Sequence, residues 1–214
     1  MDTMDLTEVR REYESRRLHK HEMDPDPVAQ FGHWLEQALG HELHEATAMT
    51  LATVSSDGQP SARMVLLKHF DRHGFCWYTD SRSRKGQHLR DNVRAALLFH
   101  WRDLSRQIRI EGPVMPLPVE EAEAYFQSRP EGSRFSAAAS HQSSEIASRE
   151  TLDAEVERLR AAYPDGKVPR PDAWIGYRLE PGYFEFWQGQ LSRQHDRITY
   201  TRQADSWVMA RLSP

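Results

Sequence analysis

Residues 49–68 read MTLATVSSDGQPSARMVLLK, and they predict two strands joined by a turn. Apolar and β-branched residues are frequent in Met49–Val54 and Arg63–Lys68, and the Asp57-Gly58 pair between them is a typical turn signal. The connection is far too short for a crossover between parallel strands, so these strands are expected to pair antiparallel.

Short apolar runs with short connections continue along the chain. They predict further strands at residues 75–79, 95–101, 106–114, 175–179, 183–188, 196–201 and 207–212, with another turn at 71–74. Helices are predicted at 83–92, 118–127 and 149–163, and the Ser- and Ala-rich residues 130–148 are expected to form a loop. The fold class is therefore expected to be mainly β with flanking helices, as a small barrel or a curled sheet.

The N-terminal part of the chain differs from this β-rich region. Residues 1–24 are polar with clustered charges, which predicts a mobile arm or a short helix without a core of its own. A helix is expected to begin at Pro27 with Asp26 as its N-cap, and one apolar face is expected to contain Phe31, Trp34, Leu35, Ala38 and Leu39. No composition change divides the remainder, so residues 25–214 are predicted to form a single domain.

Composition excludes several classes of protein. The 214 residues include six Trp, eight Phe and seven Tyr, which is incompatible with a disordered chain. The net charge of −4 argues against a general nucleic-acid binder. No apolar run approaches the ~18 residues of a membrane span, and the charged first residues argue against a secretory signal. The single Cys, Cys76, excludes an intrachain disulfide and favours a cytoplasmic location.

A group of cations late in the sequence predicts an anion site. Arg193, His195 and Arg197 follow one another two residues apart, so on an extended strand they would project from the same face. Such side chains repel one another unless an anion lies between them, which favours a phosphate pocket. The alternative is a solvated strand face whose cations pair with carboxylates such as Asp196.

A second anion signal lies at the start of the helix predicted at residues 83–92. Arg84 and Lys85 would occupy its first turn, where cations oppose the helix dipole. A phosphate bound to the free backbone N–H groups would remove that conflict. The alternative is a basic surface turn.

Two further groups could take part in an anion site. Arg63 and Lys68 flank an apolar strand at an odd separation, so they face opposite sides unless the strand contains a bulge. Tyr125 and Arg129 are four residues apart on one helix face, and Ser133 follows closely. These three side chains could hold an aromatic phosphate, although Arg129 could also serve only as a cation at a helix end.

No metal site is predicted. The pairs His19/His21 and His41/His44 lack the carboxylate or Cys arrangement typical of zinc ligands. Cys76 lies inside an apolar strand, where a buried and unreactive thiol is expected.

Taken together, these residues resemble the pyridoxamine 5′-phosphate oxidase family. The motifs that carry the resemblance are Arg63-Met-Val-Leu-Leu-Lys68, Tyr78-Thr79 with Ser83-Arg-Lys85, Tyr125-Phe-Gln-Ser-Arg-Pro130, Gln142-Ser143 and the stretch from Phe184 to Arg197. They occur in the family's order and spacing, and the resemblance covers residues 10–214. It implies an FMN-binding split β-barrel that forms a homodimer, with FMN at the subunit interface.

The resemblance also implies which residues bind the ligands. FMN would contact Arg63, Met64, Val65, Leu66, Leu67, Lys68, Tyr78, Thr79, Arg84, Lys85, Gln107, Gln142, Ser143, Trp187 and Arg197. The substrate would contact Lys68, Tyr125, Arg129, Ser133, Arg193, Gln194 and His195, together with the arm residues Arg10, Arg11, Glu12 and Tyr13, which would close over the site as a lid. Gln194 stands where the family usually has an aliphatic residue, and its side chain is expected to point away from the site.

The activity implied by the resemblance is the oxidation of pyridoxamine or pyridoxine 5′-phosphate to pyridoxal 5′-phosphate, in vitamin B6 biosynthesis or salvage. Hydride would pass from the substrate C4′ to flavin N5, and O2 would be reduced to hydrogen peroxide. Arg193 and His195 are the expected catalytic residues, with His195 as the general base for the alcohol substrate.

One departure from the family pattern and two alternatives remain. The family commonly has a Trp before Gln142-Ser143, whereas this chain has Ser136-Ala-Ala-Ala-Ser140, which implies a looser pocket wall. One alternative is a related FMN oxidase acting on another aromatic substrate, such as a phenazine precursor. Those relatives tend to lack the strand lysine and the complete Tyr-Arg-Ser set that this chain has. The other alternative is a non-catalytic carrier of flavin or pyridoxal phosphate.

Overall fold

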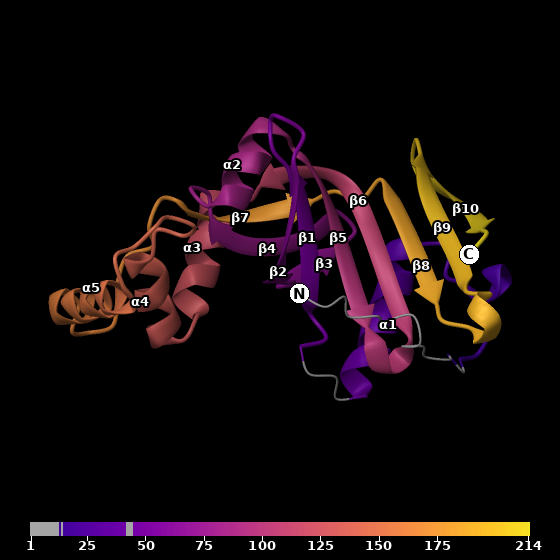
Figure 1. Ribbon diagram of the computed structural model, residues 1–214, viewed down its shortest axis with the longest axis horizontal. Helices are drawn as coiled ribbons and strands as arrows, with labels where there is room; N and C mark the ends of the chain where they lie inside the picture. The colour runs from indigo at the N-terminus through magenta and orange to yellow at the C-terminus, as the bar shows by residue number, and fades with distance from the viewer. Residues whose placement is uncertain (1–12, 14, 42–44) are drawn as a thin grey trace, which may run out of the picture. The chain divides into compact units, whose positions relative to one another are not determined.

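The computed structural model describes residue 13 and residues 15–41 and 45–214, which Figure 1 draws in colour. These residues divide into two compact units. The first takes in the described residues up to Met49, Leu97–Ile110 and Gly182–Pro214, and the second takes in Thr50–Ala96 and Glu111–Pro181. The boundaries fall inside β1 (Ala48–Val54), β5 (Arg94–Trp101) and β6 (Arg106–Pro116). None of the described helices is long and apolar enough to cross a membrane.

Three antiparallel strands form the C-terminal part of the first unit. β8 (Tyr183–Gln188) pairs with β9 (Asp196–Gln203), which pairs with β10 (Ser206–Leu212), and the three lie side by side in Figure 1. Phe184 lies opposite Tyr200 and Phe186 lies opposite Ile198, and all four side chains are fully buried. These cross-strand pairs hold β8 and β9 in register because they form part of the core.

Helix α1 (Pro27–Gly40), also in the first unit, begins as predicted. Asp26 is the N-cap, and its Oδ1 accepts a hydrogen bond from the Val28 backbone N–H at 2.9 Å. The predicted apolar face is buried except for Leu39, which is 54% exposed. That part of the prediction is wrong, because Leu39 lies at the edge of the apolar stripe. The described residues of this unit also form three short 3-10 helices: η1 (Lys20–Glu22), η2 (Arg102–Leu104) and η3 (Leu191–Arg193).

The second unit combines antiparallel strands with four helices. β3 (His69–Asp71) pairs with β4 (Gly74–Asp80), β4 pairs with β7 (Trp174–Leu179), and β7 pairs with β6. The unit also contains β2 (Pro60–Leu66), α2 (Arg84–Asp91), α3 (Val119–Ser128), α4 (Glu131–Ala139) and α5 (Arg149–Ala162). The predicted class, mainly β with antiparallel pairing and flanking helices, is confirmed. The predicted division into an arm at 1–24 and a domain at 25–214 stays a prediction.

The structure corrects two predictions in this unit. β3 was not predicted; it is short and forms a hairpin with β4. The hairpin closes at the predicted turn, where Asp71 Oδ1 accepts from the backbone N–H groups of His73 and Gly74. The expectation of a loop over residues 130–148 is wrong for Glu131–Ala139, which form α4. Its three consecutive Ala residues favour a helix, and Phe135 anchors it because that side chain is 1% exposed.

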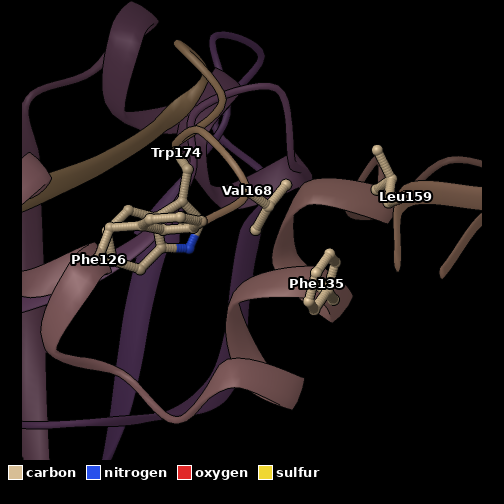
Figure 2. Close-up of a cluster of buried hydrophobic side chains, with 5 residues drawn as sticks. All are labelled: Phe126, Phe135, Leu159, Val168 and Trp174. Atoms are coloured by element: carbon tan, nitrogen blue, oxygen red, sulfur yellow. The ribbon is translucent and has the colours of Figure 1, made fainter. Parts of the chain in front are cut away.

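A small hydrophobic cluster joins α3, α4 and α5 of the second unit to β7 (Figure 2). It contains Phe126 from α3, Phe135 from α4, Leu159 from α5, Val168 from the following loop and Trp174 from β7. The edge of one ring meets the face of the other between Phe126 and Trp174, whose centroids are 5.1 Å apart. Because Trp174 belongs both to this cluster and to the rings described below, the cluster fixes the wall on which those rings stand.

Gly112 in β6 is predicted to tolerate no side chain. A Cβ there would lie 1.8 Å from the carbonyl oxygen of Glu180, a backbone group that cannot rotate away. Gly112→Ala should therefore lower the free energy of unfolding by at least about 2 kcal/mol, measured by urea denaturation. Gly132→Ala is the matched control, because a Cβ there meets no described atom within 4 Å. Equal unfolding midpoints for the two variants would contradict the prediction.

Candidate functional site

The second unit contains a cavity of about 890 Å³. Its lining comes from β2, β4, α2, α3, α4 and β7 and from the connections that follow β2, α3 and α4. The charged residues in the lining are four cations, Arg63, Lys68, Lys85 and Arg129, and one carboxylate, Asp80. The cavity is therefore suited to an anionic ligand, which would offset the repulsion among the cations.

Asp80 does little to neutralise these cations because another residue holds it. The Arg82 guanidinium makes a bidentate contact with the Asp80 carboxylate, with Nε at 3.0 Å from Oδ1 and Nη2 at 2.6 Å from Oδ2. Burial acts to raise the pKa of Asp80, but the hydrogen bonds from Arg82 outweigh burial and lower the pKa. Asp80 Oδ2 also accepts a hydrogen bond from the Gln142 backbone N–H at 3.4 Å, so the carboxylate helps to position that loop.

Arg63 and Lys68 both line the cavity, contrary to the simple strand argument. β2 ends at Leu66, so Lys68 lies beyond the strand and the alternation of faces does not apply to it. The Lys68 backbone N–H donates to the carbonyl of Cys76 at 2.9 Å, which ties this connection to β4. The end of the strand, rather than a bulge, brings the two cations to one cavity.

Lys85 lies in the first turn of α2 with only 8% of its surface exposed. Its Nζ donates to Thr79 Oγ1 at 3.1 Å, to Ser83 Oγ at 3.3 Å and to Gln142 Oε1. Ser83, which was predicted as the first residue of this helix, is the N-cap of α2 and accepts from the Gly86 backbone N–H. The ammonium group is thus fixed at the cavity by three oxygens, none of which carries a formal charge.

This environment changes the proton affinity of the cations. Burial, and then the nearby charge of Arg63, lower the pKa of Lys85 to about 8. Burial and the charge of Arg84 likewise lower the pKa of Arg63. A bound anion would offset both of these effects of neighbouring charge.

Aromatic rings form another part of the lining. Tyr78 stacks on Tyr125 with ring centroids 4.2 Å apart and on Trp174 with centroids 5.3 Å apart. The Arg129 guanidinium lies 5.1 Å from the centroid of the Trp174 ring. Arg129 Nη1 is buried and has no hydrogen-bond partner among the described residues. An unpaired buried donor in a cationic cavity is the group that a ligand oxygen would satisfy.

Most of the site residues predicted in this unit line this one cavity. They are Arg63, Met64, Val65, Leu66, Lys68, Tyr78, Thr79, Lys85, Tyr125, Arg129, Ser133 and Gln142. Leu67 is buried away from the lining, and Arg84 and Ser143 are exposed and also outside it. The lining residues that were not predicted are Asp80, Pro130, Ser140, Trp174 and the α4 residues Gly132, Ser136 and Ala137. A helical prediction for residues 131–139 would have been the signal for the last three.

The predicted site residues of the first unit form a separate group. Trp187 and His195 lie with ring centroids 4.6 Å apart, and Tyr13 meets both rings edge to face at 5.7 and 5.5 Å. The Gln190 backbone N–H donates to His195 Nδ1 at 3.1 Å, so that nitrogen is an acceptor and Nε2 carries the proton of the neutral ring. Burial and the charge of Arg193 lower the pKa of His195, which favours the neutral form.

The interpretation of Arg193, His195 and Arg197 as one strand face is wrong. Arg193 belongs to η3, where Ser192 and Arg193 both have positive φ, at 53° and 61°. β9 begins only at Asp196, so only Arg197 of the three lies on a strand. The left-handed residues turn the chain, and Arg193 and Gln194 are exposed on this turn.

Arg197 is held by a buried carboxylate. Its Nε donates to Glu185 Oε1 at 2.7 Å, and Arg109 lies 3.3 Å from Glu185 Oε2. Burial acts to raise the pKa of Glu185, but Arg197 and Arg109 outweigh it and lower the pKa. Gln107 lies half-buried in β6. The predicted arm residues Arg10, Arg11 and Glu12 lie outside the described residues.

Two family models match the chain. One, described as pyridoxamine 5′-phosphate oxidase, matches residues 35–163. The other, described as the C-terminal dimerisation region of pyridoxine 5′-phosphate oxidase, matches residues 174–214. A pyridoxine/pyridoxamine 5′-phosphate oxidase of Acaryochloris marina is 49% identical over 98% of this chain and 95% of its own length. Its counterpart in Cupriavidus metallidurans is 50% identical over 98% of this chain and 99% of its own length.

Solved structures agree with these matches. PhzG from Burkholderia lata, in complex with tetrahydrophenazine-1-carboxylic acid, superposes with a TM-score of 0.88 at 34% identity, covering 94% of this chain and 99% of that chain. A pyridoxamine 5′-phosphate oxidase-related, FMN binding protein from Nostoc punctiforme has a TM-score of 0.71 at 18% identity, covering 90% of this chain and 100% of that chain, and it supports the fold alone. The predicted split β-barrel fold is confirmed. Because a family model matches more than half of the chain and relatives are about half-identical along its length, this oxidase belongs to the pyridoxamine 5′-phosphate oxidase family.

Proposed function

We propose that the protein oxidises pyridoxamine or pyridoxine 5′-phosphate to pyridoxal 5′-phosphate with FMN as its cofactor and O2 as electron acceptor. The observation that carries the proposal is the cavity of the second unit, in which four cations and one neutralised carboxylate surround stacked aromatic rings. Both proposed ligands combine an aromatic ring with a phosphate group, so one cavity chemistry suits both.

FMN fits the cations of β2 and α2, the Thr79 hydroxyl of β4 and the Gln142 amide that follows α4. Lys85 and Arg63 would neutralise its phosphate, and Thr79 and Gln142, which now hold Lys85, would supply further polar contacts. The exposed Arg84 and Ser143 belong to the same proposal, as does Arg197 from the first unit. When bound, FMN supplies the two-electron chemistry, because it can accept a hydride equivalent and later pass electrons to O2. The chain supplies binding, orientation and proton handling.

The substrate phosphate fits Lys68, Tyr125, Arg129 and Ser133. Arg129 has the unpaired Nη1 donor described above, and the Tyr125 ring stacks against Tyr78 beside it. A phosphate oxygen would satisfy that donor in a charge-assisted hydrogen bond. Holding the substrate by its phosphate would limit the positions that its ring can take, which is the main contribution of such a contact to the rate.

Arg193 and His195 are proposed to contact the substrate as well, as the resemblance implies. The neutral form of His195, with Nδ1 occupied by the Gln190 N–H, leaves Nε2 for the ligand side. In this tautomer Nε2 carries the proton and can donate it to a substrate oxygen. For Nε2 to accept a proton from the substrate, the ring proton would first have to move to Nδ1. Tyr13, which packs on His195 and Trp187, is the one described member of the four arm residues proposed to contact the substrate.

The assembly and location are proposed on separate grounds. The match of residues 174–214 to a dimerisation region supports a homodimer. The unpaired, buried thiol of Cys76 supports a cytoplasmic location, because it needs no oxidising compartment. Production of pyridoxal 5′-phosphate would place the enzyme in vitamin B6 biosynthesis or salvage.

The similarity to PhzG makes a phenazine-type substrate the second candidate. A pyridoxamine or pyridoxine 5′-phosphate substrate is preferred because the chain is about half-identical to pyridoxine/pyridoxamine 5′-phosphate oxidases. The proposed phosphate contacts also line one cavity: Lys68, Tyr125, Arg129 and Ser133.

Anaerobic bleaching tests the proposed reaction directly. The protein loaded with FMN should lose its yellow absorbance when pyridoxamine 5′-phosphate is added without oxygen, and air should restore the colour with release of hydrogen peroxide. Unphosphorylated pyridoxamine, the matched control, should bleach far more slowly because Arg129 and Lys68 gain no partner. Ligand binding without bleaching would support a carrier, and bleaching by a reduced phenazine precursor alone would support the second candidate.

FMN binding is expected to weaken as pH rises through about 8. The lowered pKa of Lys85 means that the free protein loses this charge near pH 8, while the ligand phosphate stays dianionic. The dissociation constant, measured by flavin fluorescence, should rise by about tenfold between pH 7 and pH 9.5. Lys85→Arg should remove most of this pH dependence because arginine stays protonated. Lys85→Met should bind weakly at every pH. A flat profile for the unsubstituted protein would contradict the proposed contact.

Arg193→Ala should separate catalysis from cofactor binding. Loss of a group that orients the substrate should reduce turnover roughly 100-fold, while FMN stays bound, as measured by pyridoxal 5′-phosphate formation and flavin absorbance. Arg202→Ala, at another exposed position of the same unit, is the control and should keep its turnover. Unchanged turnover in Arg193→Ala would refute the role assigned to Arg193.

A further inference from the structure

The Arg63 guanidinium is bonded, on the side away from the cavity, to a buried polar pair formed by Thr53 and His88. Its Nη1 donates to Thr53 Oγ1 at 2.7 Å and to the Leu51 carbonyl at 3.0 Å, and its Nη2 donates to Ser61 Oγ at 2.6 Å. Thr53 Oγ1 in turn lies 3.1 Å from His88 Nδ1. All of these residues belong to the second unit, and Thr53 and His88 are absent from the cavity lining.

Hydrogen-bond chemistry gives this chain of contacts a direction. The Thr53 oxygen accepts from Arg63, which has donors only, so the hydroxyl proton of Thr53 is left to be donated. The described partner of this hydroxyl is His88 Nδ1, which accepts its proton in the tautomer that carries the ring proton on Nε2. In that tautomer the Thr53 hydroxyl donates to His88 and accepts from Arg63.

Both members of the pair are removed from solvent. Thr53 is 1% exposed and His88 is 6% exposed. A buried hydroxyl that lost its acceptor would be left unsatisfied or would rotate towards another group, so its bond to Arg63 would weaken. His88 lies on α2, the helix that begins beside Lys85, and Thr53 lies on β1. The pair thus links Arg63 to the helix that carries the other cofactor cation.

We infer that Thr53 and His88 are positioning residues that hold the Arg63 guanidinium towards the cavity for the FMN phosphate. The inference rests on the proposed function, since it assumes that Arg63 contacts FMN. Arg63 needs such support because burial and the nearby charge of Arg84 both disfavour its charged form and lower its pKa. An imidazole at His88 can fix Thr53, and through it Arg63, without placing a carboxylate beside the guanidinium. A carboxylate there would compete with the FMN phosphate for Arg63.

Substitutions at His88 test the inference through FMN affinity. His88→Leu removes the acceptor, and it should raise the FMN dissociation constant of the apo-protein by about three- to tenfold. His88→Gln offers an amide oxygen to the Thr53 hydroxyl and should stay close to the unsubstituted protein. The melting temperature of each apo-protein is measured alongside. A shift in melting temperature with unchanged FMN affinity would overturn the inference, because a merely structural role predicts that result.

A double-mutant cycle shows whether the effect passes through Arg63. In an Arg63→Ala background, His88→Leu should have almost no further effect on FMN binding. An effect of equal size in both backgrounds would overturn the inference. Where His88→Leu does not fold, Thr53→Val and Thr53→Ser replace it, because serine keeps the hydroxyl and valine removes it without changing the shape much. Weaker FMN binding by Thr53→Val than by Thr53→Ser supports the inference. Equal FMN binding by the two variants overturns it.

The same titrations distinguish the two proposals. If the unsubstituted apo-protein and Arg63→Ala bind FMN equally poorly, the proposed function fails and the inference fails with it. If the unsubstituted protein binds FMN, Arg63→Ala binds it weakly and His88→Leu matches the unsubstituted protein, only the inference fails.

Discussion

Repulsion among the buried and half-buried cations of the second unit is the constraint that organises its site. Lys85 is almost completely buried among neutral oxygens, Arg63 lies near enough to lower its pKa, and Arg129 keeps a donor without a partner. The carboxylate in the lining is already paired with Arg82. Burying charges without counterions costs stability, so an arrangement of this kind is maintained for a ligand rather than for the fold.

The scaffold around these cations is correspondingly rigid. Lys85 is held by a capped helix start, Arg63 by three hydrogen bonds, and Arg129 by the ring of Trp174. Trp174 also belongs to the cluster of Phe126 and Phe135, so the helices after β6 and the aromatic wall share one small core. Such support lets a site keep its geometry without a ligand, and it reduces the entropy lost on binding.

The chain is an oxidase of a family whose relatives include both pyridoxine/pyridoxamine 5′-phosphate oxidases and a structural neighbour that binds a phenazine carboxylic acid. A shared fold therefore leaves the substrate open, and the side chains of the cavity must decide it. Lys68, Tyr125, Arg129 and Ser133 favour a phosphorylated ring. Residues 136–139 of the Ala- and Ser-rich segment form the end of α4, so part of that wall is a helix, and the expected looser wall stays a prediction.

Local sequence patterns were sufficient for most of the strands, the helix capped by Asp26 and the start of α2, because alternation, turn residues and caps act between residues close in the chain. They also identified Lys85 as a cation in the first turn of a helix, and Tyr125 with Arg129 as an aromatic residue and a cation on one helix face. They failed for α4, whose helical state depends on burying Phe135 against distant residues. They also failed for the turn at Ser192 and Arg193, because these left-handed residues are not glycines and the sequence therefore gives no turn signal there. Only the tertiary structure brought Arg63 and Lys68 to one cavity and placed His88 behind Thr53, because contacts between separate strands and helices depend on packing that no local pattern contains.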